Sequence, residues 1–174
     1  NLVEKIAAGE VIERPASIVK ELVENSIDSG SRVIDVLIEN GGKSLISVKD
    51  NGCGISKDDL PLAFKRYATS KIRTIKDFNS ISTLGFRGEA LASMASVSSI
   101  SIKTAENSEY GFEMKICGRD FSNIKKIPKK QGTTISIRKL FENLPARKKF
   151  LKSSESEQIA ITKLMKQYFL SFPE

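Results

Sequence analysis

Apolar residues near the start of the chain recur at the spacing of an α-helix. Pro15 suits the first position of a helix, where its missing N–H costs nothing, and Gly30 suits the position past the end. The apolar positions between these two residues form one stripe at 3.6-residue spacing: Ile18, Val19, Leu22, Val23 and Ile27. The pattern predicts an amphipathic helix between Pro15 and Gly30.

The pattern then changes to strict alternation. In Val33–Glu39 every second residue is Ile or Val, which is typical of a strand. Asn40–Gly42 (Asn-Gly-Gly) is a hairpin turn signal, and Leu45–Lys49 continues as the return strand. These two strands should be antiparallel.

The middle of the chain mixes helical and unpatterned segments. Lys57–Arg66 predicts a short helix with Leu60 and Phe64 on one face, and Gly88–Ala95 predicts a helix that opens on glycine. Between them, residues 67–86 lose any period. A stretch of this length inside a domain is usually a functional loop or lid.

Four strand-like segments and a helix complete the chain. Short polar joins predict an antiparallel meander of Val97–Lys103, Tyr110–Ile116, Phe121–Ile127 and Thr133–Arg138. Ser154-x-x-Glu157 is a capping-box pattern that opens the last helix. The expected apolar face of that helix consists of Ile161, Leu164, Met165, Tyr168 and Phe169. Because βαβ alternation is absent, we predict an α+β two-layer sandwich, with helices on one face of a mixed, mostly antiparallel sheet.

Composition narrows the class of protein. The 174 residues are 40% hydrophobic, as in a folded domain, and no apolar run is long enough for a membrane span. The net charge of +7 suits an anionic partner or simply a solvated surface. The chain has no histidine, which excludes His-based triads and His metal sites from this segment. Two cysteines are too few for a disulfide framework, which indicates a reducing, intracellular compartment.

The first candidate site lies on the first predicted helix. Glu21, Asn25 and Asp28 share one narrow face that borders the apolar stripe. A carboxylate beside an amide suits a magnesium–phosphate site, in which the amide oxygen ligates Mg²⁺ and the carboxylate deprotonates a water. Taken alone, such a pair is far more often part of a solvated helix.

The second candidate site follows the return strand. Asp50 can accept a hydrogen bond from an exocyclic amine such as that of adenine, and Gly52 and Gly54 let a flat base approach the backbone. The alternative for this segment is an ordinary turn. Thr133, in Gly-Thr-Thr at the start of the last strand, is a further candidate that alone would be a plain strand start.

The third candidate site is a phosphate cradle where the predicted lid meets a helix. Its residues are Gly85, Arg87, Gly88, Glu89, Ala90 and Leu91, with Thr69, Ser70 and Lys71 inside the lid. Free N–H groups at a helix start bind phosphate, although a glycine-bounded loop that enters a helix would look the same. Neither a P-loop nor a Rossmann fingerprint is complete in the sequence.

Together and in this order, the motifs E-x-x-x-N, D-x-G-x-G, G-x-x-G and G-T resemble the GHKL ATPases, which include DNA gyrase, heat-shock chaperones, sensor histidine kinases and MutL. The resemblance within that group is to MutL, over residues 5–151. It rests on Ile6–Pro15 (IAAGEVIERP), Lys20–Asp28 (KELVENSID), Asp50–Gly54 (DNGCG), Thr69–Lys71 (TSK), Gly85–Leu91 (GFRGEAL) and Pro145–Leu151 (PARKKFL).

The resemblance implies a role for each site residue. Glu21 would be the general base, Asn25 the Mg²⁺ ligand and Asp50 the residue that reads adenine. Gly52, Gly54 and Thr133 would line the base pocket. Phosphates would be held by Arg87, by the segment from Gly85 to Leu91 that includes Gly88, Glu89 and Ala90, and by a lid over residues 67–88 that carries Thr69, Ser70 and Lys71.

The resemblance also implies a biological setting. Family members use ATP to order the lid and close two N-terminal domains around DNA, with slow hydrolysis resetting the switch. Expected partners are DNA, a second copy or a MutL paralogue, and a MutS-type protein, with no membrane. The expected location is cytoplasmic in a bacterium and nuclear in a eukaryote.

The family's N-terminal domain continues past residue 174 into a second subdomain, which supplies a lysine to the terminal phosphate, and a C-terminal domain follows. We therefore expect residues 1–174 to be an ATP-binding subdomain that binds nucleotide better than it hydrolyses it. Competing interpretations are a sensor-kinase or gyrase-type domain, which would lack GFRGEAL, and a DNA-binding module with a vestigial pocket.

Overall fold

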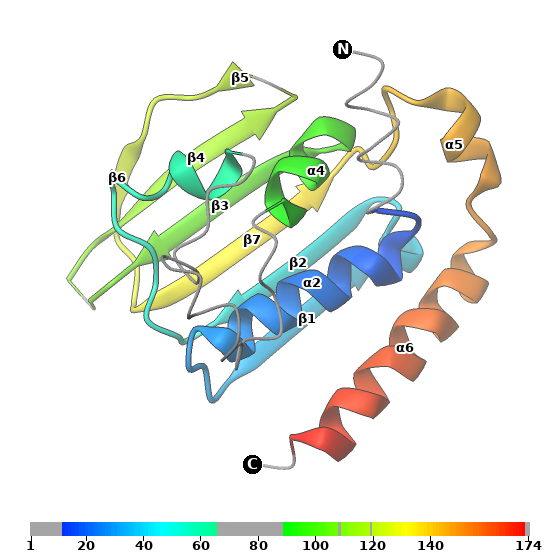
Figure 1. Cartoon of the computed structure of the whole chain (residues 1–174), viewed down its shortest axis with the longest axis horizontal. Helices are drawn as coiled ribbons and strands as arrows, with labels where there is room; N and C mark the ends of the chain where they lie inside the picture. The colour runs from blue at the N-terminus through cyan, green and yellow to red at the C-terminus, as the bar shows by residue number, and fades with distance from the viewer. Residues whose placement is uncertain (1–11, 66–88, 108, 119, 173–174) are drawn as a thin grey trace, which may run out of the picture.

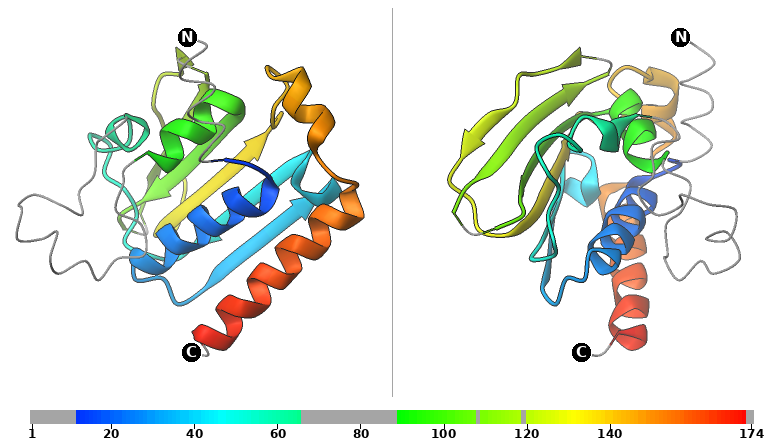
Figure 2. Two further views of the ribbon diagram at one scale, coloured as in Figure 1. Left: turned by 45° about the vertical axis from the view of Figure 1, so that its right-hand side comes forward. Right: turned by 60° about the vertical axis from the view of Figure 1, so that its left-hand side comes forward.

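The computed structural model describes residues 12–65, 89–107, 109–118 and 120–172. Helices α2 (Pro15–Asp28) and α4 (Ala90–Val97) cover one face of a seven-stranded sheet, and α6 (Ser154–Ser171) lies beside α2 (Figure 1). The short helix α5 (Pro145–Phe150) connects the sheet to α6. The predicted α+β sandwich with helices on one face is confirmed (Figure 2).

The sheet is antiparallel in every recorded pairing among the described strands. Its strands are β1 (Ile34–Glu39), β2 (Leu45–Asp50), β3 (Ser99–Ala105), β4 (Gly111–Cys117), β5 (Asp120–Phe121), β6 (Lys125–Ile127) and β7 (Gly132–Arg138). The spatial order is β1-β2-β7-β3-β4-β5, and β6 also pairs with β4. The predicted hairpin of β1 and β2 is confirmed.

The predicted meander of the last four strands is wrong, because β7 inserts between β2 and β3. The predicted strand Phe121–Ile127 is also two strands, β5 and β6. Between them the Lys115 N–H donates to the Ser122 hydroxyl at 2.9 Å, and this side-chain acceptor interrupts the backbone ladder. Alternation predicts which segments are strands, but neighbours in the chain need not be neighbours in the sheet.

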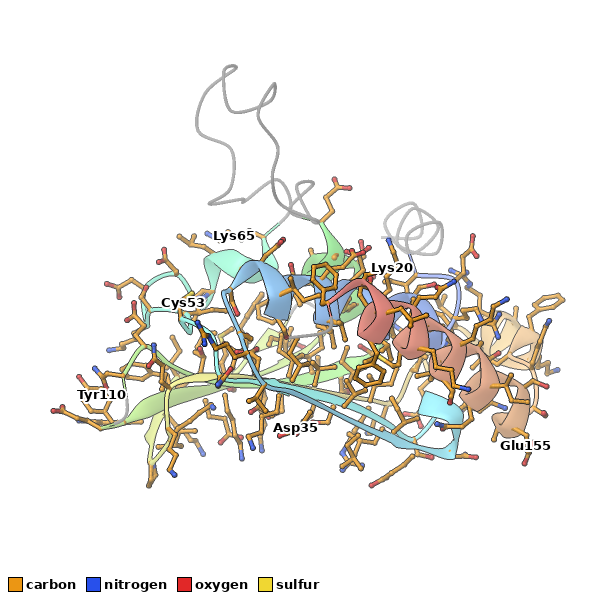
Figure 3. The ribbon with its side chains drawn as sticks, turned by 90° about the horizontal axis from the view of Figure 1, so that it is seen from below. Lys20, Asp35, Cys53, Lys65, Tyr110 and Glu155 are labelled. Carbon is orange, nitrogen blue, oxygen red and sulfur yellow. The ribbon has the colours of Figure 1, made fainter. Side chains whose placement is uncertain are left out.

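The core lies between the sheet and the helices. Ile46 and Val48 of β2 and Ile135 and Ile137 of β7 are buried there, against the apolar stripe of α2. Residues at the alternate positions point to the opposite face, which carries no helix among the described residues. Asp35 lies on that open face (Figure 3) and pairs with Lys49 at 3.2 Å.

Helix α2 ends as its sequence predicts. Pro15 is in the first turn, and the Ser29 N–H donates to the Asn25 carbonyl at 3.0 Å to close the last turn. Gly30 follows with a φ of +75°, which an L side chain rarely adopts. The next residues can therefore reverse direction at once into β1.

The predicted helix at Lys57–Arg66 is wrong for the described residues. Residues 57–61 form turns, and only Leu62–Phe64 forms a 3₁₀ turn. Pro61 interrupts the pattern, because proline has no N–H to give and its ring crowds the preceding turn. Leu60 and Phe64 are nevertheless both buried, as their spacing predicted.

The capping-box prediction at α6 is also wrong. Ser153, rather than Ser154, caps the helix, and its hydroxyl accepts from the Ser156 N–H at 3.2 Å. The Glu157 Oε1 accepts from the Lys152 backbone N–H at 3.1 Å, one residue before the N-cap, and its Oε2 binds Arg14, at 3.0 and 2.9 Å from Nε and Nη2. On the predicted apolar face, Phe169 is 68% exposed, because α6 packs along one side only.

Candidate nucleotide site

Asp50 is the best-defined member of the candidate site. It ends β2 and is 8% exposed. Its Oδ1 accepts from the backbone N–H groups of Gly52 at 2.9 Å and Thr133 at 3.0 Å. Its Oδ2 accepts from the Ser26 hydroxyl at 3.3 Å. The carboxylate thus joins α2, β2 and β7, and its orientation is fixed from three directions.

The two glycines after Asp50 are required by close contacts. A Cβ on Gly52 would collide with the Ser29 hydroxyl, and one on Gly54 would collide with the Ala105 carbonyl oxygen. Gly54 also has a φ of +75°. The turn therefore lies against the end of α2 and against β3, and the two glycines are needed for this packing within the protein.

A pair of threonines extends the site beneath Asp50. The Thr133 hydroxyl lies 3.0 Å from that of Thr104, and the Thr104 hydroxyl accepts from the Ile55 N–H at 2.8 Å. Both threonines are buried. The structure thus places Thr133 with Asp50, Gly52 and Gly54, as predicted. Sequence analysis did not single out Thr104 or Ser26, since neither stands in a motif of its own.

Glu21 and Asn25 lie on α2 and are half-buried, as is Asp28. Ser26, the next residue after Asn25, contacts Asp50. The helix segment with E-x-x-x-N is thereby attached directly to the Asp50 end of the site.

Glu24, on the same turn of α2, is a buried carboxylate that sequence analysis missed. It is 7% exposed and accepts a hydrogen bond from the Tyr168 hydroxyl of α6 at 2.8 Å. The Lys20 ammonium lies 3.5 Å from the same oxygen. Burial, first, and then the hydrogen bond and charge of Glu24 and the charge of Glu21 raise the pKa of Tyr168 above its ordinary value.

One lysine approaches Asp50 from the segment before β7. Burial lowers the pKa of Lys129, and the nearby charges of Lys49 and Lys103 lower it further, while Asp50 opposes them. Lys129 therefore places a partly desolvated cation near the Asp50 end of the sheet.

The described part of the predicted phosphate cradle is the start of α4. Glu89 is the N-cap residue, and its side chain makes no capping hydrogen bond. Ala90 and Leu91 begin the helix, so their N–H groups lack partners within it. The other predicted cradle and lid residues lie outside the described residues: Thr69, Ser70, Lys71, Gly85, Arg87 and Gly88.

The described residues show neither a cluster of metal-binding side chains nor a membrane-spanning helix. Within residues 12–65 and 89–172, apart from 108 and 119, no three Cys, Asp or Glu side chains gather as a metal site would require. Over the same residues, no helix combines the length and apolar character needed to cross a membrane.

The class of protein follows from a sequence comparison. A profile described as histidine kinase-, DNA gyrase B- and HSP90-like ATPase matches residues 13–149, which include Glu21, Asn25, Asp50 and Thr133. The chain belongs to this ATPase family.

Within the family, the similarity is to MutL. The chain is 54% identical to the DNA mismatch repair protein MutL of Clostridium acetobutylicum, over 98% of the chain and 28% of that protein. It is 52% identical to MutL of Citrifermentans bemidjiense, over 100% of the chain and 27% of that protein. The chain thus spans little more than a quarter of the length of these relatives.

Solved structures agree with this assignment. The Aquifex aeolicus MutL ATPase domain complexed with ADP superposes with a TM-score of 0.74 at 32% identity, covering 94% of the chain and 57% of that structure. The N-terminal domain of a DNA repair protein gives a TM-score of 0.80 at 28% identity, covering 95% and 48%. Sequence and fold therefore both indicate a MutL ATPase domain.

Proposed function

We propose that this chain is the ATP-binding and slowly ATP-hydrolysing domain of a DNA mismatch-repair protein. The observation that carries the proposal is the Asp50 carboxylate, held at the end of β2 by Gly52, Thr133 and Ser26. A carboxylate has about four acceptor positions, so the amine of adenine can be a further donor. The ADP complex of the similar Aquifex aeolicus domain supports this assignment.

We propose that Glu21 and Asn25 carry the hydrolysis. Asn25 would hold Mg²⁺ together with the ATP phosphates, since Mg²⁺ usually keeps few protein ligands beside substrate phosphates and water. The bound ion would neutralise phosphate charge. Glu21 would take a proton from the attacking water. The water oxygen would bond to the terminal phosphorus as the bond between that phosphorus and ADP breaks.

The phosphates themselves would be held at the start of α4. Helix N–H groups of Ala90 and Leu91 can bind anions there, next to Glu89. We further propose that Gly85, Arg87, Gly88 and the lid residues Thr69, Ser70 and Lys71 complete the cradle.

We propose that nucleotide binding orders the lid and pairs two such domains as a clamp on DNA. The names of the relatives, DNA mismatch repair proteins, support a role with DNA. We further propose an intracellular location, a second copy or a paralogue as the paired domain, and a MutS-type protein as a partner. Because the chain covers about a quarter of those proteins, residues 1–174 would form an ATP-binding subdomain. We expect it to bind nucleotide better than it hydrolyses it.

The test is equilibrium binding of a non-hydrolysable ATP analogue with Mg²⁺ to the chain and to Asp50→Asn. Asparagine keeps an oxygen for the Gly52 and Thr133 N–H groups but cannot accept from an amine at its NH₂ group. Loss of one charged hydrogen bond should weaken binding about 10- to 100-fold, from about 1.5–3 kcal/mol.

The matched control is Asp35→Asn on the open face of the sheet, which removes the same charge and should leave binding unchanged. Equal affinity of Asp50→Asn and the unaltered chain would show that Asp50 does not read the base. Saturable binding of DNA by Asp50→Asn without nucleotide would favour the DNA-binding module instead.

A further inference from the structure

Tyr168 and Glu24 form a buried hydrogen bond between α6 and the helix that carries the proposed catalytic residues. The two side chains are 144 residues apart in the chain, and their oxygens lie 2.8 Å apart. A buried carboxylate is costly unless it is paired, and Glu24 has both the Tyr168 hydroxyl and the Lys20 ammonium. The contact is therefore a strong and directional link from α6 to α2.

The position of Glu24 on α2 means that this contact restricts rotation of the helix about its axis. At about 100° per residue, Ser26 lies about 200° from Glu24 around the helix axis, and Glu21 and Asn25 lie within that arc, at about 60° and about 100° from Glu24. Ser26 is bound to Asp50 on one side, and Glu24 is bound to Tyr168 on the other. Rotation of α2 about its axis would have to break one of these two contacts.

The chemistry of Tyr168 keeps the link intact at neutral pH. An ordinary tyrosine is already a neutral donor at this pH, and burial, first, and the neighbouring carboxylates, Glu24 above all, raise the pKa of Tyr168 further, so it stays a donor in mild alkali as well. The effect of Glu21 on the same phenol places Tyr168 near the proposed base as well.

We propose that Tyr168 is a positioning residue for ATP hydrolysis, which fixes the rotation of α2 through Glu24 and thereby directs Glu21 and Asn25. The proposal rests on the proposed function of Glu21 and Asn25. The hydrogen bond of Tyr168 is to Glu24, so the proposed effect on Glu21 and Asn25 passes through Glu24 and the helix that carries all three residues. Asp50 is also held by Gly52 and Thr133, which lie outside α2, so nucleotide binding should depend less on the rotation of α2 than hydrolysis does.

The first test is Tyr168→Phe in the full-length protein, with kcat and nucleotide Kd measured separately. Small displacements of catalytic groups are costly, so kcat should fall about tenfold while Kd changes less than about threefold. Tyr110→Phe is the matched control. It removes the hydroxyl of a tyrosine that is 37% exposed and lies just before β4. It should change neither quantity.

The second test separates positioning from general stability. Arg14→Gln breaks a polar contact between the start of α2 and Glu157 of α6. It should lower the melting temperature, but it should not cause the loss of kcat that is expected for Tyr168→Phe. Glu24→Gln keeps an oxygen for the Tyr168 hydroxyl and should retain more of kcat than Glu24→Ala. The double variant Glu24→Ala with Tyr168→Phe should be no slower than Glu24→Ala alone.

Three outcomes would overturn the inference: an unchanged kcat in Tyr168→Phe, an equal loss in Arg14→Gln, or additive losses in the double variant. If kcat is unchanged in Tyr168→Phe while Asp50→Asn still weakens nucleotide binding as expected, the proposed function stands without this role. If the unaltered protein binds no nucleotide, the proposed function fails and the inference fails with it.

Discussion

The Thr133 hydroxyl of β7 lies 3.0 Å from the Thr104 hydroxyl of β3, directly beneath the turn that follows Asp50. Thr133 also gives its N–H to Asp50, and Thr104 receives the N–H of Ile55. The Thr133 backbone N–H and the Thr104 hydroxyl thus connect the two ends of the Asp50–Ile55 turn to the sheet, and the two buried hydroxyl groups join these threonines to each other.

Replacing Thr104 by valine should destabilise the fold, because the Ile55 N–H loses its acceptor in a buried place. An unsatisfied buried donor costs about 1–3 kcal/mol in the free energy of unfolding. Urea unfolding measures the loss. Thr134→Val, half-buried on the other face of β7, is the control, and an equal loss there would contradict the account.

Gly54→Ala should lower the free energy of unfolding more than Gly30→Ala does, although both glycines have a φ of +75°. The two substitutions share the cost of a left-handed backbone, about 1–2 kcal/mol. Only Gly54 would in addition press a Cβ against the Ala105 carbonyl, whereas Gly30 faces open space. Gly54→Ala should also weaken binding of the ATP analogue. Equal stability and binding in the two variants would be incompatible with a tight turn at Gly54.

Arg14→Gln should lower the free energy of unfolding by about 1.5–3 kcal/mol, because Glu157 is buried and loses a charged partner. Lys49→Gln breaks the pair with Asp35, which is exposed on both sides, and should cost less than about 1 kcal/mol. Chemical unfolding of both variants decides the matter. Similar losses would mean that burial of Glu157 adds nothing to its pair.

The raised pKa of Tyr168 predicts a particular loss of stability in alkali. The folded state holds the phenol proton more tightly than the unfolded state, so this contribution is complete below pH about 10 and is lost as the pH rises further. The free energy of unfolding should therefore fall less steeply above that pH in Tyr168→Phe than in the unaltered chain. Tyr110→Phe should keep the steeper fall. Identical slopes in all three proteins would rule out the buried phenol as the cause.

Much of the fold could be predicted from local pattern. Pro15 and Gly30 bound α2 because backbone geometry at helix ends restricts which residues fit, and the alternation of β1 and β2 reflects one buried face. The errors share another cause. Pro61 overrode a helical spacing, Ser153 caps α6 one residue earlier than the predicted box, and Glu157 also pairs with Arg14, which is far away in sequence.

The candidate site was predictable in part for the same reason. Asp50, Gly52 and Gly54 carry local requirements, whereas the support from Ser26, Thr104 and Tyr168 depends on how distant segments pack. No spacing rule within α2 or α6 could place Tyr168 against Glu24.

The central place of β7 also has a consequence for how the protein is made. The strand that gives Asp50 one of its backbone donors is separated from it by 83 residues and enters the sheet between strands that precede it in the chain. A growing chain therefore cannot complete the proposed adenine site until Thr133 has left the ribosome and β7 has inserted. The capacity to bind nucleotide would then mark a chain whose sheet is complete, and a bound ligand would stabilise only that state.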